Sequence, residues 1–84
     1  FMSSIIMSMD KTLATLTFEF RRLSEKKPND TVNEFKLNIV NKILAEANKE
    51  LGRTPIEGFS QFNTDTLPTN SDVLFVLALY QDCF

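Results

Sequence analysis

The side chains that most often catalyse reactions are scarce in this sequence of 84 residues. It contains no His, one Cys (Cys83) and two Gly. Without His there is no Ser-His-Asp triad, Cys-His pair or HExxH helix, and one Cys cannot form a CxxC pair or a Cys-rich zinc site. The separated glycines, Gly52 and Gly58, cannot form a GxGxxG turn or a phosphate-binding loop. The sequence thus excludes the common catalytic, metal and cofactor motifs.

The remaining titratable groups are better explained as ordinary surface residues. Glu46 and Glu50 are one helical turn apart and could act as general acid and base, but a solvated helix face explains the same spacing. Asp65 and Asp72 lie in a polar stretch that lacks EF-hand spacing. Cys83 has no base to activate it as a nucleophile. We therefore expect a non-enzymatic protein with no catalytic residue, no cofactor and no metal.

Two features suggest contact with another molecule. Arg21, Arg22, Lys26 and Lys27 form a basic cluster that could bind phosphate or anionic headgroups, although interleaved Glu residues also suit a solvated helix end. In a helix, Phe18 would point away from the apolar stripe and lie beside Arg22. A single exposed Phe is common in soluble proteins, so this residue is a candidate contact only in combination with others.

Charge is distributed unevenly along the chain. Residues 1–53 hold nine basic and seven acidic residues, and residues 54–84 hold four acidic residues and no basic one. The total charge of −2 therefore hides halves of opposite sign. A nucleic-acid-binding protein usually presents a basic face, so we do not expect nucleic acid as a partner. Opposite charges are compatible with attraction between the halves, within one chain or between chains.

The first third of the sequence has helical periodicity. Seven of the apolar residues, spaced from Met2 to Leu23, fall within an arc of about 80°, which predicts a helix over about residues 3–27. Pro28 would end it, because the residue before a proline avoids the α region. Residues 13–20 also alternate between apolar and polar, which would suit a strand, but this alternation is shorter than the helical pattern.

The second predicted helix, residues 31–51, has recognisable ends. Thr31 and Glu34 match a capping box, and Gly52 stands where a left-handed residue often ends a helix. The apolar residues of this helix sweep about 200° of its circumference, roughly twice the stripe that one core requires. We therefore expect the helix to contact partners on two sides.

A shorter helix is predicted near residues 55–62. Thr54, Pro55 and Glu57 repeat the signal for a helix N-terminus. Without this helix, residues 53–70 would form a loop of about 18 residues, which is unusual in a compact domain.

The last predicted helix covers residues 71–84, with Asn70 or Ser71 as its N-cap. Residues 73–80 carry no charge, so the alternative is a buried strand that pairs with 13–20 in a strand–helix–strand arrangement. Because two strands and one helix make a poor sheet, the helix is the preferred interpretation.

This final helix would be apolar on every side. One stripe can face the core, but Phe75 and Leu79 point the other way. Their cover must come from the 53–70 segment, from a missing C-terminal continuation or from another chain. We expect a homodimer or a complex with another protein, in which Phe18, Arg22, Phe75 and Leu79 form the candidate interaction surface.

These elements predict a small all-α bundle in a single domain, residues 1–84. The first residue, Phe1, is not Met, which suggests a fragment or a processed chain. No apolar run reaches the roughly 20 residues of a membrane span, the N-terminus lacks a secretory signal, and a single Cys fits a reducing cytoplasm. The predicted core consists of Leu13, Leu16, Phe20, Ile39, Ile43 and Leu77.

One stretch resembles a known family. The segment "KKPNDTVNEFKLNIVNKILAEANKEL" is similar to the proline-containing turn and long second helix of pediocin-like bacteriocin immunity proteins. The resemblance implies a small cytoplasmic helical bundle that protects a producer cell through a membrane-receptor complex, with only indirect membrane contact. This family tends to be basic, whereas the present chain is acidic. No functional residue is carried over from it, and protein–protein interaction remains the first expectation.

Overall fold

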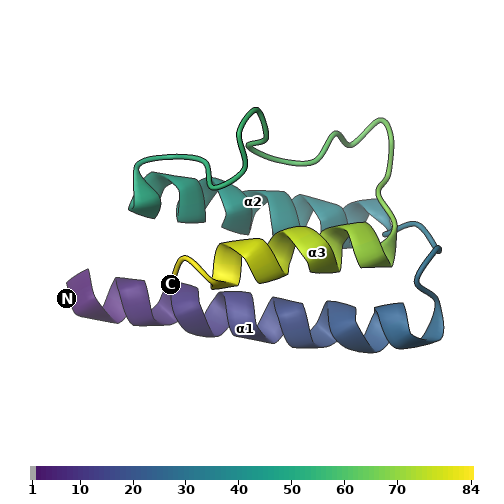
Figure 1. The fold of residues 1–84 in the computed structure, drawn as a ribbon, viewed down its shortest axis with the longest axis horizontal. Coiled ribbons are helices and arrows are strands. Elements are labelled where there is room, and N and C mark those ends of the chain that lie inside the picture. The colour runs from purple at the N-terminus through teal and green to yellow at the C-terminus, as the bar shows by residue number, and fades with distance from the viewer. Residues whose placement is uncertain (1) are drawn as a thin grey trace.

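Three helices make up the fold. The computed structural model describes the backbone of residues 2–84 and the side chains of residues 9–84. The helices are α1 (Met2–Lys26), α2 (Glu34–Leu51) and α3 (Asn70–Gln81) (Figure 1). No strand occurs within residues 2–84, and residues 13–20 and 73–80 are both helical. The all-α prediction is confirmed, and the strand–helix–strand alternative is wrong.

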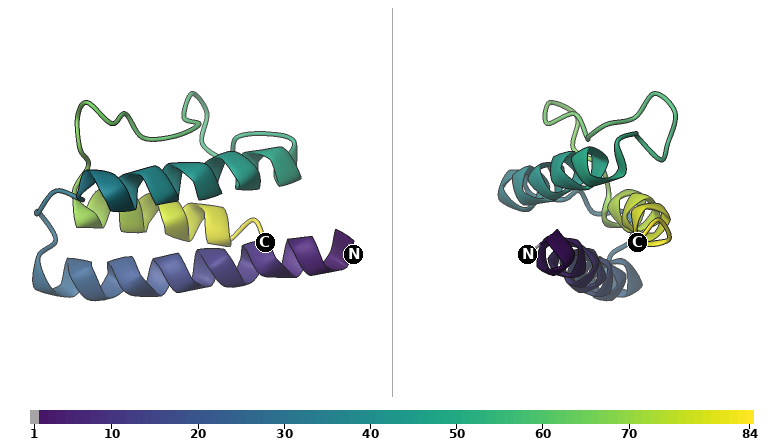
Figure 2. Two further views of the ribbon diagram at one scale, coloured as in Figure 1. Left: turned by 180° about the vertical axis from the view of Figure 1, so that it is seen from behind. Right: turned by 90° about the vertical axis from the view of Figure 1, so that its left-hand side faces the viewer.

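The helices run side by side, with α2 and α3 both antiparallel to α1 (Figures 1 and 2). Helices α1 and α3 form the closest pair. The N-terminal turns of α1 extend past the end of α3, because α1 has 25 residues and α3 has 12. The helix pair that is closest in space is therefore the pair that is farthest apart in the sequence.

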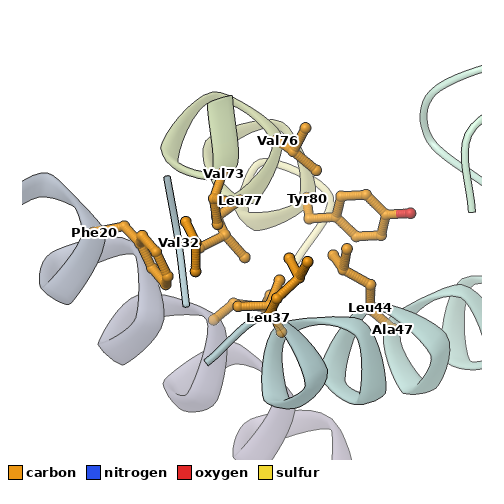
Figure 3. Close-up of a cluster of buried hydrophobic side chains, with 11 residues drawn as sticks. Phe20, Val32, Leu37, Leu44, Ala47, Val73, Val76, Leu77 and Tyr80 are labelled. Atoms are coloured by element: carbon orange, nitrogen blue, oxygen red, sulfur yellow. The ribbon is translucent and has the colours of Figure 1, made fainter. Parts of the chain in front are cut away.

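All three helices contribute side chains to one core (Figure 3). Leu13, Phe20 and Leu77 are buried in it, as predicted. The predicted core residues Leu16 and Ile43 lie at its margin, half-buried. Ile39 was wrongly predicted to be buried, since 39% of its surface is exposed. The fully buried apolar residues of α2 and α3 are Leu37, Val40, Leu44, Ala47, Val73, Leu77 and Tyr80.

The start of α2 differs from the predicted one. Asn33 is the N-cap, and its side-chain oxygen accepts a hydrogen bond from the backbone N–H of Lys36 at 2.8 Å. Thr31 is instead extended and pairs with Thr69, just before α3. At the other end, Gly52 adopts the predicted left-handed conformation, with φ of 70°.

Helix α3 begins one residue earlier than predicted. Thr69 is its N-cap, in place of Asn70 or Ser71, and forms a capping box with Asp72. The Thr69 hydroxyl accepts from the Asp72 N–H, and the Asp72 carboxylate accepts from the Thr69 N–H, both at 3.2 Å. These reciprocal bonds satisfy two backbone donors that the helix itself leaves free.

The linker between α1 and α2 is bonded to the start of α3. The Val32 N–H donates to the Pro68 carbonyl, and the Asn70 N–H donates to the Asp30 carbonyl, each at 2.9 Å. The Asn70 side chain, itself buried, donates to the Lys27 carbonyl at 2.8 Å. These bonds fix the end of α1 level with the start of α3.

The predicted short helix near residues 55–62 is absent. The chain instead turns at Gly58, whose φ of 77° interrupts any right-handed helix, and the Phe59 N–H donates back to the Ile56 carbonyl at 3.1 Å. The rings of Phe59 and Phe62 contact each other edge to face, with centroids 5.0 Å apart. Residues 53–69 therefore form a long loop that packs on the bundle.

Candidate interaction surface

Large apolar side chains are exposed on all three helices. Among the described side chains they are Phe18 on α1, Phe35 and Ile39 on α2, and Phe75 and Leu79 on α3. The two pairs on α2 and α3 are each separated by four residues, so each pair occupies one helix face. Burying such side chains is worth about 1.5–3 kcal/mol each, which makes these faces candidates for contact with another molecule.

The exposed pair on α3 is bordered by acidic residues. Phe75 is 67% exposed and Leu79 is 37% exposed, so neither the 53–69 loop nor another helix covers them. Asp72 lies one turn before Phe75, and Asp82 lies one turn after Leu79; both are exposed. At 100° per residue, these four residues fall within about 80° of the α3 circumference.

The exposed residue on α1, Phe18, is bordered by charges of both signs. Phe18 is 59% exposed and Arg22 lies one turn further along the same face. Lys11 and Glu25 are also exposed, and the four residues fall within about 60° of the α1 circumference. The Arg22 guanidinium is 3.5 Å from the Glu19 carboxylate, but both side chains are about half exposed. An ion pair of this kind is weak, so Arg22 can exchange its partner at little cost.

The structure therefore places the four predicted surface residues on two adjoining helices. Phe18 and Arg22 lie on α1, while Phe75 and Leu79 lie on α3, and each pair is on the side of its helix opposite the buried residues. We call the outer sides of these two helices together the α1–α3 face. Its members are Lys11, Phe18, Arg22 and Glu25 on α1, and Asp72, Phe75, Leu79 and Asp82 at α3.

Sequence reasoning missed the exposed pair on α2. Phe35 is 73% exposed, the highest value among the large apolar side chains described. Phe35 and Ile39 were both included in the broad apolar arc of this helix. The helical phase divides this arc into one stripe with Leu37 and Leu44 and a roughly opposite one with Phe35 and Ile39, but it does not say which stripe is buried.

The predicted basic cluster is divided between two places. Lys26 and Lys27 line an open cavity of about 350 Å³ where α1 ends and α2 begins, together with Lys36. The two arginines of the cluster are not among the residues that line it. Asp30 lies in the same cavity, 3.9 Å from the Lys27 ammonium, and offsets part of the positive charge. This arrangement gives no strong preference for an anion.

A polar network holds the 53–69 loop against α2. The Asn41 side chain, 8% exposed, donates to the Phe62 carbonyl and accepts from the Phe62 N–H, both at 2.9 Å. Asn48 donates to the Ser60 carbonyl at 3.0 Å and accepts from the Tyr80 hydroxyl at 2.6 Å. These groups satisfy one another, so the network explains the position of the loop and leaves no free group for chemistry.

Burial raises the pKa of the Tyr80 hydroxyl above its ordinary value of 10.0. The hydroxyl is therefore neutral at physiological pH and cannot serve as a base.

Cys83 is half-buried, and its thiol donates to the Leu79 carbonyl at 3.6 Å. Within the part of the chain that the structure describes, no group of three or more metal-ligating side chains occurs.

None of the described helices has the length and apolar content that crossing a membrane requires. A scan against protein families and searches of curated proteins and solved structures found no match to this chain.

Proposed function

We propose that this protein acts by binding another protein chain through the α1–α3 face. The observation that carries the proposal is the exposed pair Phe75 and Leu79 on α3. The opposite side of this helix, at Val73, Leu77 and Tyr80, is fully buried in the core. Helix α3 thus has apolar residues on its outer surface as well as on its inner one. Apolar patches bordered by polar residues are typical of protein interaction sites.

The rest of the molecule supports an interaction role over catalysis. The sequence has no His, and the single Tyr is buried and protonated. The open cavity at the end of α1 holds lysines and one carboxylate without a nucleophile–base pair. A non-enzymatic function is therefore part of the proposal. The resemblance to immunity proteins stays a prediction, since no feature of the α1–α3 face favours it.

Site-specific photo-crosslinking tests this proposal in the cell that makes the protein. A photoreactive phenylalanine analogue replaces Phe75 in one variant and Phe35, on α2, in the control variant. Both positions are highly exposed, at 67% and 73%, so they sample solvent equally well. We expect a discrete protein adduct from position 75 that is absent from position 35 and is lost when Leu79→Glu is added.

The mass of the adduct identifies the kind of partner. An adduct of twice the 9.6 kDa chain mass indicates a second copy, and any other discrete mass indicates a different protein. The proposal is wrong if position 75 gives no discrete adduct, or if both positions give the same ones.

A further inference from the structure

We infer that the outer side of α3 binds a basic segment of a different protein chain, one that carries apolar side chains between two cations. This inference rests on the proposed function and names the chemistry of its partner. It depends on α3 alone. Phe75 and Leu79 form the exposed apolar pair, and the carboxylates of Asp72 and Asp82 border the pair at its two ends.

The carboxylates of this surface have no cation within the protein to pair with. Among the described side chains, neither Asp72 nor Asp82 forms an ion pair. Residues 54–84 hold four acidic residues and no basic one. The neighbouring helix α1 offers charges of both signs, since Arg21 and Glu25 are both exposed and lie one turn apart. The outer side of α3 is therefore an acidic border around an apolar centre.

Asp82 stands at a position where the helix itself disfavours a carboxylate. It is the C-cap of α3, and its backbone N–H donates to the Ala78 carbonyl at 3.1 Å. The C-terminal end of a helix carries partial negative charge, so an anion there is destabilising and a cation is stabilising. The last turn of α3 contains no basic residue. A cation from a partner would interact favourably with both the carboxylate and the helix end.

The same charges exclude the common polyanionic ligands. Asp72 and Asp82 repel the phosphates of nucleic acids and of anionic lipid headgroups, which bind to basic surfaces. Phe75 and Leu79 gain from burial only against other apolar groups. A polypeptide segment that combines Lys or Arg with large apolar side chains meets both requirements, with an apolar centre and a charged rim.

The spacing on α3 defines the pattern that a helical partner needs. Asp72 and Asp82 are ten residues apart, which is about 15 Å of helix. The intervals along the surface are three, four and three residues, so the pattern reads the same in both directions. A partner helix with two cations ten residues apart and two apolar residues between them, at the same intervals, therefore matches α3 in either orientation.

A synthetic helical peptide with this pattern tests the chemistry against the full chain. The probe carries Lys at both charged positions and Leu at both apolar positions, and the control peptide carries Glu in place of Lys. Fluorescence anisotropy of the labelled peptides measures binding. We expect the Lys peptide to bind at least about tenfold more tightly than the Glu peptide, because Glu replaces attraction with repulsion. Its affinity should fall as salt is added.

Substitutions on the chain locate the binding surface. Phe75→Ser should weaken binding of the Lys peptide about tenfold, because it removes an aromatic residue from the centre of the contact. Asp82→Asn should weaken it about two- to fivefold, as expected for one exposed charge pair. The matched controls are Phe35→Ser on α2 and Asp65→Asn in the 53–69 loop, which should leave the affinity unchanged. All four residues are exposed, so circular dichroism should show intact helices.

Asp82→Lys separates a role in binding from a role in folding. In the free chain it should raise the urea midpoint, because it places a cation at the C-terminal end of α3. It should also reduce the preference for the Lys peptide over the Glu peptide. Asp65→Lys makes the same change of charge in the loop and should have neither effect. A midpoint that Asp82→Lys leaves unchanged or lowers would contradict the argument from the helix end.

The remaining outcomes distinguish this inference from the proposed function. If the two peptides bind equally, or if neither binds, the basic partner is wrong, while a discrete adduct from position 75 in the cell would still support the interaction surface. If that adduct forms, mass spectrometry should find Lys or Arg on both sides of the crosslinked residue of the partner. An adduct of twice the chain mass would identify a second copy and overturn the inference of a different chain.

Discussion

At the scale of single residues, two asparagines on α2 organise more of the molecule than any charged group does. Asn41 and Asn48 are seven residues apart, two helical turns, and so face the same side. Asn41 bonds both backbone groups of Phe62, as a neighbouring strand would, and Asn48 joins the loop to Tyr80. The ion pairs that the structure shows are exposed and weak by comparison.

Replacing Asn41 with Ala should lower the free energy of unfolding by about 2–3 kcal/mol. Two hydrogen bonds are lost, at about 1 kcal/mol each, and the half-buried Phe62 backbone loses its partners. Urea denaturation measures this loss, and hydrogen exchange should show faster exchange of the Phe62 amide. Asn38→Ala, at an exposed position on the same helix, is the control and should change stability by less than about 0.5 kcal/mol.

Tyr80 should destabilise the fold at alkaline pH. Its pKa is raised by burial, so the folded chain holds this proton more tightly than the unfolded chain does. The resulting stability is fully present below pH 10, the unfolded value, and is lost as the pH rises through the higher folded value. Ionisation also removes the hydrogen bond that the hydroxyl donates to Asn48.

Ultraviolet absorbance can follow this titration, because Tyr80 is the only tyrosine in the sequence. We expect its midpoint to lie above 10.0 in the folded chain and to return to about 10 in urea. Tyr80→Phe should cost about 1 kcal/mol at neutral pH and make the alkaline loss of stability smaller. Equal midpoints in the folded and unfolded chain would contradict the effect of burial.

At the scale of helices, the rotation of α2 decides what is core and what is surface. Its apolar residues cover two possible inner faces, and the structure uses the one that contains Leu37 and Leu44. Ile43 then lies at the edge of the core, and Ile39 is left on the outside. The sequence alone could not choose between the two faces, because both are apolar and the choice depends on where α1 and α3 lie.

Alanine substitutions along α2 should reveal this rotation. Leu44→Ala should cost about 2–5 kcal/mol, because Leu44 is fully buried and its loss leaves a cavity. Ile39→Ala should cost less than about 1 kcal/mol, and Ile43→Ala should fall between the two. Chemical denaturation of the three variants gives the order. A larger loss for Ile39→Ala than for Leu44→Ala would mean that the helix is rotated differently.

The predicted C-terminus of α2 was correct, and the contact that determines it is local. Gly52 ends α2 because a left-handed residue is needed there and glycine adopts that conformation at least cost. The start of α2 moved from Thr31 to Glu34 because Thr31 pairs with Thr69, which is distant in the sequence. The short helix near Pro55 was predicted from local signals, but Gly58 and the contacts of Phe59 and Phe62 favour a loop.

The candidate surface was predictable only in part, because exposure depends on local periodicity whereas the neighbours of each helix depend on packing between distant segments. The exposure of Phe18, Phe75 and Leu79 follows from helical periodicity alone, and the structure confirms it. That these residues lie on neighbouring antiparallel helices follows only from the packing of α1 against α3.

At the scale of the whole molecule, the helices and the 53–69 loop share one core. Ile56, Phe59, Phe62 and Leu67 of the loop pack against the same cluster as the buried residues of the three helices. The bonds between the α1–α2 linker and the start of α3 join distant parts of the chain at one end of the bundle. No described part of the chain has a separate core that could remain folded alone.

We therefore expect a single cooperative unfolding transition. Far-ultraviolet circular dichroism follows the helices, and the fluorescence of Tyr80 follows the packing between α3 and α2. The two signals should give the same urea midpoint when measured at a concentration low enough to keep the chain monomeric. Two separate midpoints would show that one helix leaves the bundle before the others.

The close packing of α1 against α3 also has a consequence for synthesis of the protein. A ribosome makes α1 first and α3 last, and α1 contacts α2 far less closely than it contacts α3. A nascent chain that has emerged only as far as the 53–69 loop therefore exposes the inner faces of both finished helices, at Leu13, Phe20 and Leu37. Such surfaces are targets for chaperones until α3 is released and completes the bundle.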